Sequence, residues 1–419
     1  MIKKSCIIIS LLTLILVSGN IHIGANPQPV PIFWMRVNNS VPVRTDYKCV
    51  YDHNSYIYFF GGQDSLGQMP NDVYKLRIDA PYSWIRNNAP GPEGRIGHAL
   101  GHAIGSYNLI LFGGINQAGQ YLNDTWLYDS YNGIWRQVDS TGPSPRAYSS
   151  ITYNRRTQGF VLFGGMNGDS LFGDTWEWYF TSGWHFKSDN GPSPRIDAGL
   201  VTPYQSYVQI LYGGRAGFDG EVYNDIWEWW DTSWVQGQPL DSLWPTPRVN
   251  FAIGSYEGEI IIVGGQDAAN TDSILNDSWW ITYPWFPSVR ARQWLVPELL
   301  QGRYGAYAVP GQSRAILLGG NKNTQNLHDV WLYPMYSYRP GDVNNNGKFN
   351  GMDLVYMVNF WKGTGPPPPC YVECWEGQML YGPADADGSC SFDGLDITYL
   401  LNYLKGFGSA PAACSTCGL

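Results

Sequence analysis

Six copies of one short pattern constrain this 419-residue chain more than any other feature of its sequence. An apolar run that ends in two glycines recurs at intervals of roughly 50 residues. The copies are YFFGG (58–62), LILFGG (109–114), FVLFGG (160–165), QILYGG (209–214), IIIVGG (260–265) and AILLGG (315–320). Paired glycines end a strand where another backbone passes close or where φ is positive. The chain is therefore expected to contain an array of similar small units, each with a central strand.

Each unit continues with a polar-Asp-x-aromatic motif, then a lone Trp, and closes on a Pro-rich turn and an Arg. The motifs are NDVY (71–74), NDTW (123–126), GDTW (173–176), NDIW (224–227), NDSW (276–279) and HDVW (328–331). The lone tryptophans are Trp84, Trp135, Trp184, Trp234 and either Trp285 or Trp294. Four short apolar runs between turns leave no room for a helix. The unit is therefore predicted to be a four-stranded antiparallel sheet, which buries both faces only between neighbours.

These six units resemble the repeats of the kelch β-propeller family over residues 32–337. The resemblance implies a mainly β fold, with a six-bladed kelch-type propeller over residues 26–338. The sixth unit lacks a lone-Trp strand, whereas residues 32–44 contain one with nothing before it. We therefore predict that residues 32–38 form the outer strand of the last blade and close the ring.

Composition agrees with this fold and excludes one class of partner. Aromatic residues make up 15% of the chain and there are 49 glycines, as short strands joined by tight turns require. The net charge is −9, with no basic stripe, and nucleic-acid binding depends mainly on neutralising phosphates. We expect no nucleic-acid partner.

The N-terminus has the pattern of a secretory signal peptide over residues 1–25. Lys3 and Lys4 precede an apolar run over residues 6–17, and small residues follow. A transmembrane anchor, the alternative, needs roughly 18 apolar residues, more than this run has. We expect a secreted or cell-surface protein without a transmembrane segment in the mature chain.

Two stretches near the C-terminus have the ligand spacing of calcium-binding loops. Their predicted ligands are Asp342, Asn344, Asn346, Lys348 (through its carbonyl), Asn350 and Asp353, and then Asp385, Asp387, Ser389, Ser391, Asp393 and Asp396. Gly347 provides the sharp turn of the first loop, whereas Cys390 stands at that position in the second. An apolar stripe with helical period follows each loop. The sequence therefore predicts two calcium ions, each beside one helix.

Two such loops, each with only an exiting helix, resemble a dockerin domain over residues 341–406, within a segment spanning 339–419. The resemblance implies calcium-dependent docking to a cohesin-like module. The family's recognition positions correspond to Gly351, Met352, Val358, Asn359, Gly394, Leu395, Leu401 and Asn402. Val358 and Leu401 also belong to the apolar stripes, so a core role is the alternative. Cys370, Cys374, Cys390, Cys414 and Cys417 are expected to form disulfides in an exported protein, with a zinc site as the alternative.

One arginine per unit is the main candidate for ligand binding. The set is Arg44, Arg95, Arg146, Arg195, Arg248 and Arg303. These side chains could ring one mouth of the central channel and attract an acidic glycan or protein. In the alternative, each arginine pairs with the Asp of its repeat and fixes the geometry of the blade.

The sequence gives no catalytic pair. His98 and His102 share one side of a predicted strand, but no further metal ligands are evident. Glu177 and Glu228 recur at one repeat position and are expected to face outward. The favoured function is a non-catalytic binding propeller for a protein or glycan, attached through its dockerin-like module. The alternatives are a carbohydrate-active enzyme of polysaccharide degradation in a cellulosome-like assembly, and a structural surface protein.

Overall fold

The computed structural model describes residues 35–36, 44–52, 55–77, 84–203, 206–240, 242–256, 258–269, 273–285, 288–294, 303–310, 315–322, 325–327, 330–333, 351–362, 372–373, 379–380 and 394–404. The chain divides into two compact units. Trp34–Pro334 forms one, and Met335–Leu419 belongs to the other. The predicted signal peptide, most of the predicted calcium ligands and the five C-terminal cysteines lie outside the described residues. No described helix is long and apolar enough to cross a membrane.

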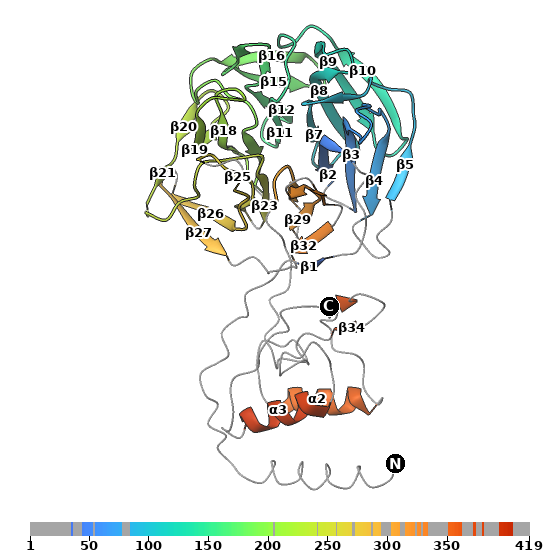
Figure 1. Ribbon diagram of the computed structural model, residues 1–419, viewed down its shortest axis with the longest axis vertical. Helices are drawn as coiled ribbons and strands as arrows, with labels where there is room; N and C mark the ends of the chain where they lie inside the picture. Colours follow the sequence, from blue (N-terminus) through green and yellow to red (C-terminus); the bar gives the residue numbers. More distant parts are fainter. Residues whose placement is uncertain are drawn as a thin grey trace. The chain divides into compact units, whose positions relative to one another are not determined.

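Within the first unit, the described residues form six sheets of four or five strands, which follow one another around a centre in chain order (Figure 1). The first three sheets contain β2 (Thr45–Tyr51), β3 (Tyr56–Gln63), β4 (Val73–Arg77) and β5 (Trp84–Asn87); β6 (Arg95–Ile96), β7 (Ala99–His102), β8 (Asn108–Asn116), β9 (Tyr121–Asp129) and β10 (Ile134–Asp139); and β11 (Ser150–Asn154), β12 (Gly159–Phe163), β15 (Thr175–Tyr179) and β16 (Gly183–Ser188). The other three contain β17 (Gly199–Val201), β18 (Gln209–Arg215), β19 (Val222–Trp229) and β20 (Trp234–Gln236); β21 (Gln238–Pro239), β23 (Ala252–Tyr256), β24 (Glu259–Val263), β26 (Ser278–Trp285) and β27 (Ser288–Trp294); and β28 (Tyr307–Pro310), β29 (Ala315–Leu318), β32 (Val330–Tyr333) and β1 (Met35–Arg36). We call these sheets blades 1 to 6, and the arrangement is a β-propeller.

Four short two-stranded sheets complete the described strands. They are β13 (Met166–Asn167) with β14 (Ser170–Leu171), β22 (Arg248–Val249) with β25 (Gln266–Asp267), β30 (Asn321–Lys322) with β31 (Gln325–Asn326), and β33 (Val372–Glu373) with β34 (Met379–Leu380). The first three lie in the propeller unit, and the last lies in the second unit.

The ring closes on strands from the two ends of the propeller unit. The innermost strands β2, β7, β11, β17, β23 and β28 neighbour one another in that order, and β28 also lies beside β2. At the outer edge of blade 6, Met35 and Arg36 of β1 pair antiparallel with Leu332 and Trp331 of β32. Of the strand predicted over residues 32–38, the structure describes Met35 and Arg36. These two residues form the outer strand of blade 6, as predicted.

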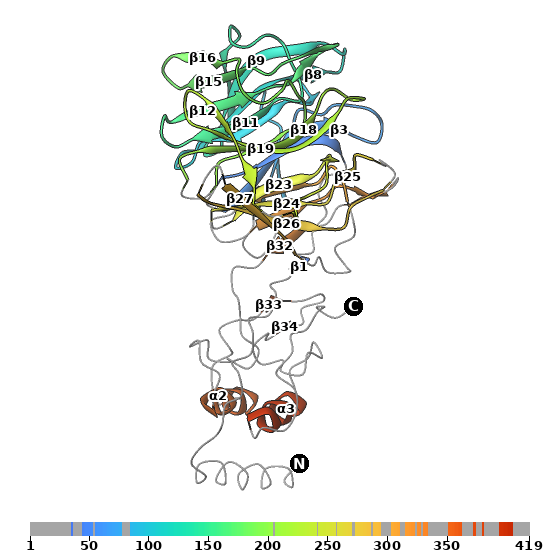
Figure 2. The same ribbon diagram turned by 90° about the vertical axis from the view of Figure 1, so that its left-hand side faces the viewer.

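The core lies between blades, because the second strand of each blade buries both of its faces. In β3, Tyr58 and Phe60 pack toward blade 2, whereas Ile57 and Phe59 belong to the cluster that includes Leu318 of blade 6. The same alternation places clusters between blades 2 and 3, blades 3 and 4, and blades 4 and 5. This explains why these strands read as continuous apolar runs, and Figure 2 shows the sheets from the side.

In the second unit, two helices occupy the segments that follow the predicted calcium loops. They are α2 (Gly351–Trp361) and α3 (Gly394–Leu404), which contact each other.

Candidate functional site

The repeat arginines are buried inside the blades. Nη1 and Nη2 of Arg95 donate to Oδ1 and Oδ2 of Asp124 at 2.6 and 2.9 Å, and Nη1 also donates to the Gly113 carbonyl at 2.9 Å. The same pairing joins Arg44 to Asp72, Arg146 to Asp174, Arg195 to Asp225 and Arg248 to Asp277. Arg303 donates to the Gly319 carbonyl at 2.8 Å. Each guanidinium therefore joins strands of its own blade.

The backbone of the same arginines joins neighbouring blades through the paired glycines. The N–H groups of Gly114, Gly165 and Gly265 donate to the carbonyls of Arg146, Arg195 and Arg303 at 2.9, 2.9 and 2.8 Å. The six guanidinium groups do not line the central cavity of the described structure. Five of the six arginines thus pair with the Asp of their repeat, as the structural alternative has it, and other residues stand at the mouth of the cavity.

The residue two positions after each repeat arginine forms a ring around the propeller axis. The six positions are Asp46, Gly97, Tyr148, Asp197, Asn250 and Gly305, all with φ between 54° and 63°. The N–H groups of Tyr148 and Asp197 donate to the preceding ring carbonyls, of Gly97 and Tyr148, at 2.6 and 3.1 Å. The positive φ at each of these positions changes the direction of the chain just before the innermost strand of the blade. We call these six residues the mouth ring.

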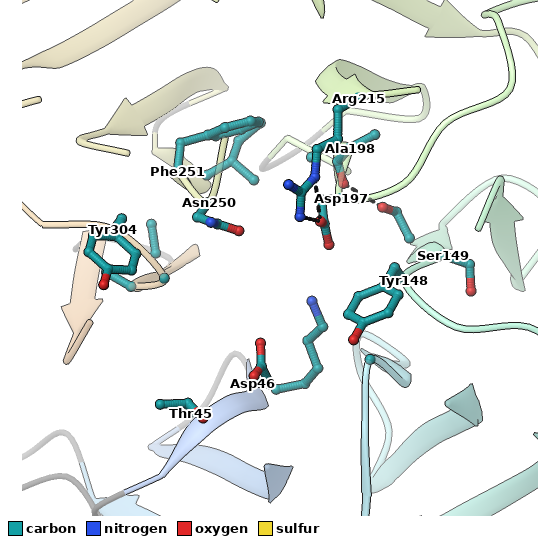
Figure 3. A pocket seen from close by; sticks show the side chains of 18 of the residues that line it. Thr45, Asp46, Tyr148, Ser149, Asp197, Ala198, Arg215, Asn250, Phe251 and Tyr304 are labelled. Carbon is teal, nitrogen blue, oxygen red and sulfur yellow. Dashed lines mark hydrogen bonds and ion pairs between the residues drawn. The ribbon is translucent and has the colours of Figure 1, made fainter. Parts of the chain in front are cut away.

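The mouth ring surrounds a cavity of about 640 Å³ at the start of the innermost strands. Residues from all six blades line it, among them Thr45, Lys48, Ser149, Arg215, Phe218, Phe251, Tyr304 and Asn321. In Figure 3, Asp46 and Tyr148 face Asp197 and Arg215 across this space. The cavity therefore combines carboxylates, cations, amides and aromatic rings, as recognition sites do.

The charged side chains of the cavity differ in the hydrogen bonds and ion pairs that they make. Arg215 Nη2 and Nε lie 2.9 and 3.3 Å from Asp197 Oδ2, and the Arg215 guanidinium lies 4.8 Å from the Phe218 ring centre. Tyr148 packs edge-on against the same Phe218 ring at 5.2 Å. Burial, and then the charge of Asp197, raise the pKa of Asp46, although Lys48, Thr45 and Arg215 oppose this. Burial also raises the pKa of Tyr148.

The histidine pair does not form a metal centre in the described residues, where no group of three or more His, Cys, Asp and Glu side chains gathers as metal ligands do. His98 is fully buried, burial lowers its pKa, and its ring packs edge-on against Phe60. His102 Nε2 lies 3.0 Å from the Ser106 carbonyl. Both histidines are therefore parts of the packed interior.

The expected outward orientation of Glu177 and Glu228 is wrong, because both are buried. Glu177 accepts hydrogen bonds from Asn154, Thr157 and Tyr179 and forms an ion pair with Lys187. Glu228 accepts a hydrogen bond from Trp230 Nε1 at 2.9 Å. Burial raises the pKa of Glu228 to about 6. Both faces of a blade are covered by neighbours, so strand alternation does not distinguish inside from outside here.

In the second unit, two of the predicted calcium ligands occupy equivalent positions at the starts of the two helices. Asp353 and Asp396 lie in the first turns of α2 and α3 and are 0% exposed. Of the predicted docking residues, Val358 is buried, Leu401 is partly buried, and Asn359 and Asn402 are exposed. Gly351, Met352, Gly394 and Leu395 belong to the helices, but nothing is described of their side chains. The other ligands lie outside the described residues.

Sequence analysis missed the mouth ring, although a signal for it exists. In every unit the ring residue stands two positions after the repeat arginine, where Gly, Asp and Asn occupy five of the six copies. These are the residue types that tolerate positive φ. Aligning the units on their arginines would have exposed this position.

Comparisons with known proteins place the propeller in one family. The sequence profile of the KLHDC2/KLHL20/DRC7 Kelch-repeats domain matches residues 46–265. An F-box/kelch-repeat protein of Arabidopsis thaliana is 31% identical over 51% of this chain and 50% of its own length. The host cell factor homolog hcf-1 of Caenorhabditis elegans is 29% identical over 29% of this chain and 18% of its own. The chain thus spans half or less of these relatives.

A solved structure shows the same fold at low sequence identity. The structure of YjhT superposes with a TM-score of 0.55 and 17% identity, covering 70% of this chain and 96% of that one. Together with the repeat motifs and the sheet topology, the match over residues 46–265 shows that this chain belongs to the kelch-repeat family of β-propellers.

Proposed function

We propose that the propeller is a non-catalytic binding module that receives a segment of another protein in its central cavity. The observation that supports this most directly is the cavity itself, to which all six blades contribute residues. Four of the six ring positions carry side chains in a backbone conformation that glycine adopts at less cost. Strain of this kind is concentrated at binding sites, where the surrounding structure maintains it. In the relatives, the matched region is part of a longer chain, as a recognition module would be.

A display selection with the full chain tests this proposal. Peptides selected from a random library are measured by fluorescence anisotropy against the wild type and two matched variants. Tyr148→Asn changes the mouth ring, and Asn tolerates the φ of 59° found there. Tyr131→Asn changes a tyrosine that is 76% exposed and does not line the cavity.

The expected result is at least a tenfold loss of affinity in Tyr148→Asn and less than a twofold change in Tyr131→Asn. Equal affinities in all three proteins would contradict a cavity site. Turnover of a glycan panel that disappears in Asp46→Asn or Asp197→Asn would instead support the carbohydrate-active alternative, because both carboxylates line the cavity.

We further propose that residues 339–419 bind two calcium ions and dock to a cohesin-like module. Two helices of equal length support this, each following a loop with oxygen ligands at calcium spacing. Each helix buries the residue of the last loop position, Asp353 or Asp396, which in a calcium loop normally supplies the decisive carboxylate. The remaining residues of the loops would supply the other oxygens.

Attachment through this module fits a secreted or cell-surface protein, with residues 1–25 as the signal peptide. In that compartment the C-terminal cysteines would be oxidised. Binding to a purified cohesin module in the presence of calcium, and its loss in EDTA, tests the docking step.

A further inference from the structure

We propose that the contact between blades 1 and 2 is acid-sensitive and opens when the buried side chain of His98 takes up a proton. We call this contact the joint. The proposal concerns a conformational property of the propeller and does not depend on the proposed ligand. It follows from the place of the imidazole, its lack of hydrogen-bond partners, the charges around it and the residues that replace it in the other blades.

His98 belongs to blade 2, but its ring packs against blade 1. It stands between β6 and β7, and its ring centre lies 5.4 Å from that of Phe60 on β3, at an interplanar angle of 84°. A Cβ added at Gly61 of the same strand would lie 2.6 Å from His98 Cε1. The side chain is 0% exposed. The imidazole therefore fills the joint beside the glycine pair of blade 1.

Neither ring nitrogen of His98 has a hydrogen-bond partner in the part of the chain that the structure describes. A neutral imidazole carries one N–H group, whereas the protonated ring carries two and a positive charge. Burying the cation without partners costs far more than burying the neutral ring, because the charge loses its hydration. The closed joint therefore favours the neutral form, and the protonated form is favoured once the blades separate.

The charges around the imidazole strengthen this preference. The strands around His98 carry the titratable residues Asp46 and Lys48 on β2, Tyr56 and Tyr58 on β3, Arg95 on β6, His102 on β7 and Asp124 on β9.

Burial lowers the pKa of His98 well below its ordinary value of 6.5, and the positive charges of Arg95 and Lys48 lower it further. Neither carboxylate of the set offsets this effect. Asp124 is bonded to Arg95, and Asp46 is exposed at the mouth ring. The joint thus places a neutral histidine beside two cations.

The other blades show that the repeat does not require an imidazole at this position. Three residues after the repeat arginine, blades 1 to 6 carry Tyr47, His98, Ser149, Ala198, Phe251 and Ala306. Among these residue types, histidine is the one whose ordinary pKa lies between pH 5 and 8. The acid-sensitive contact is therefore specific to the joint between blades 1 and 2.

The joint adjoins the mouth ring. Gly97, which directly precedes His98, is a ring residue, and its carbonyl accepts a hydrogen bond of 2.6 Å from the Tyr148 N–H. Separation of blade 2 from blade 1 displaces this segment of the chain. Opening of the joint therefore also disturbs the mouth ring.

The sign of the pH effect follows from the direction of the shift. The pKa of His98 is lower in the closed joint than in an opened one, so the joint keeps its full stability above pH 6.5 and loses stability below it. Each pH unit below 6.5 raises the equilibrium constant for opening about tenfold, until the pKa of the closed form is reached.

Hydrogen exchange of the full chain, measured by mass spectrometry at pH 7.5 and 5.5 and corrected for intrinsic exchange rates, tests the proposal. The reporting strands are β3 and β7, and the reference strands are β24 and β29 of blades 5 and 6. His98→Gln removes the titration, and His98→Ala repeats the test with the residue found in blades 4 and 6. His185→Gln is the matched control, because it removes an exposed histidine from β16.

We expect opening of β3 and β7 to rise about tenfold from pH 7.5 to 5.5 in the wild type and in His185→Gln, and less than twofold in β24 and β29. In His98→Gln and His98→Ala the rise should fall below about threefold, the remainder belonging to His102, whose pKa burial also lowers. An equal rise in wild type and both His98 variants would overturn the proposal. So would an equal rise in all four strands of the wild type, a result that needs no variant to fold.

Discussion

At the scale of single residues, the repeat arginine has the largest structural role. Arg146 is 1% exposed, pairs with Asp174 and donates to the Gly164 carbonyl, while its own backbone N–H donates to the Leu122 carbonyl. Removing it leaves an acceptor and a charge without compensation in a site that water reaches poorly. Such losses cost more than the pair contributes in net terms.

We therefore expect Arg146→Met to lower the free energy of unfolding by about 3 kcal/mol. Arg136→Met is the control, because Arg136 is exposed on β10 and should change stability by less than about 0.5 kcal/mol. Denaturant titrations monitored by tryptophan fluorescence measure both. Similar midpoints for the two variants would contradict the role assigned to the buried arginine.

Glu228 provides a pH-dependent prediction. Its pKa of about 6 in the folded protein exceeds the ordinary value of 4.5, so the folded state holds the proton more tightly than the unfolded state does. Stability contributed by this group is therefore lost as the pH rises from 4.5 through 6. We expect Glu228→Gln to be more stable than the wild type at pH 8, by about 1–2 kcal/mol, and equally stable at pH 4. A difference that does not change between these pH values would exclude Glu228 as its source.

At the scale of elements, the second glycine of a pair allows two segments of its own blade to pass closely and also bonds the next blade, as Gly165 shows. Gly165 has φ of 102°, and a Cβ there would lie 2.8 Å from the Ala147 carbonyl oxygen and 3.0 Å from Ser149 Cβ. Its N–H also bonds the next blade. The glycine thus combines a backbone conformation, a close approach and an inter-blade hydrogen bond.

Gly165→Ala should therefore destabilise the propeller by more than about 2 kcal/mol, because φ strain and a backbone clash add. Gly168→Ala is the matched control in the adjacent hairpin. It also has positive φ, 57°, but a Cβ there meets nothing within 4 Å, so the cost should stay near 1 kcal/mol. Thermal unfolding of both variants measures the difference, and equal losses would show that conformation alone matters.

At the scale of the whole molecule, closure of the ring depends on β1. Deleting residues 26–40 removes this strand, exposes the edge of β32 and should lower the melting temperature by roughly 5–10 °C. The control deletion of residues 26–31 stops before β1 and should leave the melting temperature within about 1 °C. An unchanged melting temperature in the longer deletion would contradict closure by this strand.

Calcium binding is the second prediction at this scale. After EDTA treatment and dialysis, the full chain should bind two calcium ions in calorimetry and gain helical circular dichroism as they bind. Asp353→Asn should reduce the count to one, because the last loop position normally provides the decisive carboxylate. Helicity that is unaffected by EDTA in oxidised and in reduced protein would contradict the dockerin-like assignment.

The sequence alone determined the features that depend on local spacing. Strand length, the glycine pairs and the repeat Asp and Arg recur with one period, so the propeller could be predicted and later confirmed by the family match. The two described helices likewise lie where their apolar stripes predicted them. Each of these features depends on the order of a few dozen consecutive residues, because the periodicity of a strand or helix is a local property of the sequence.

Which side chains meet at the propeller axis depends on how the blades pack and cannot be read from a single repeat. The repeat arginines were correctly found as a recurring set, but their direction depends on the Asp and the glycine carbonyl that each blade presents. The orientation of Glu177 and Glu228 was misjudged because neighbouring blades cover both faces of a strand. Asp46, Tyr148 and Asp197 come together because rotation about the axis brings distant segments to one cavity, and a left-handed turn aims them there. No periodicity within one repeat contains that information.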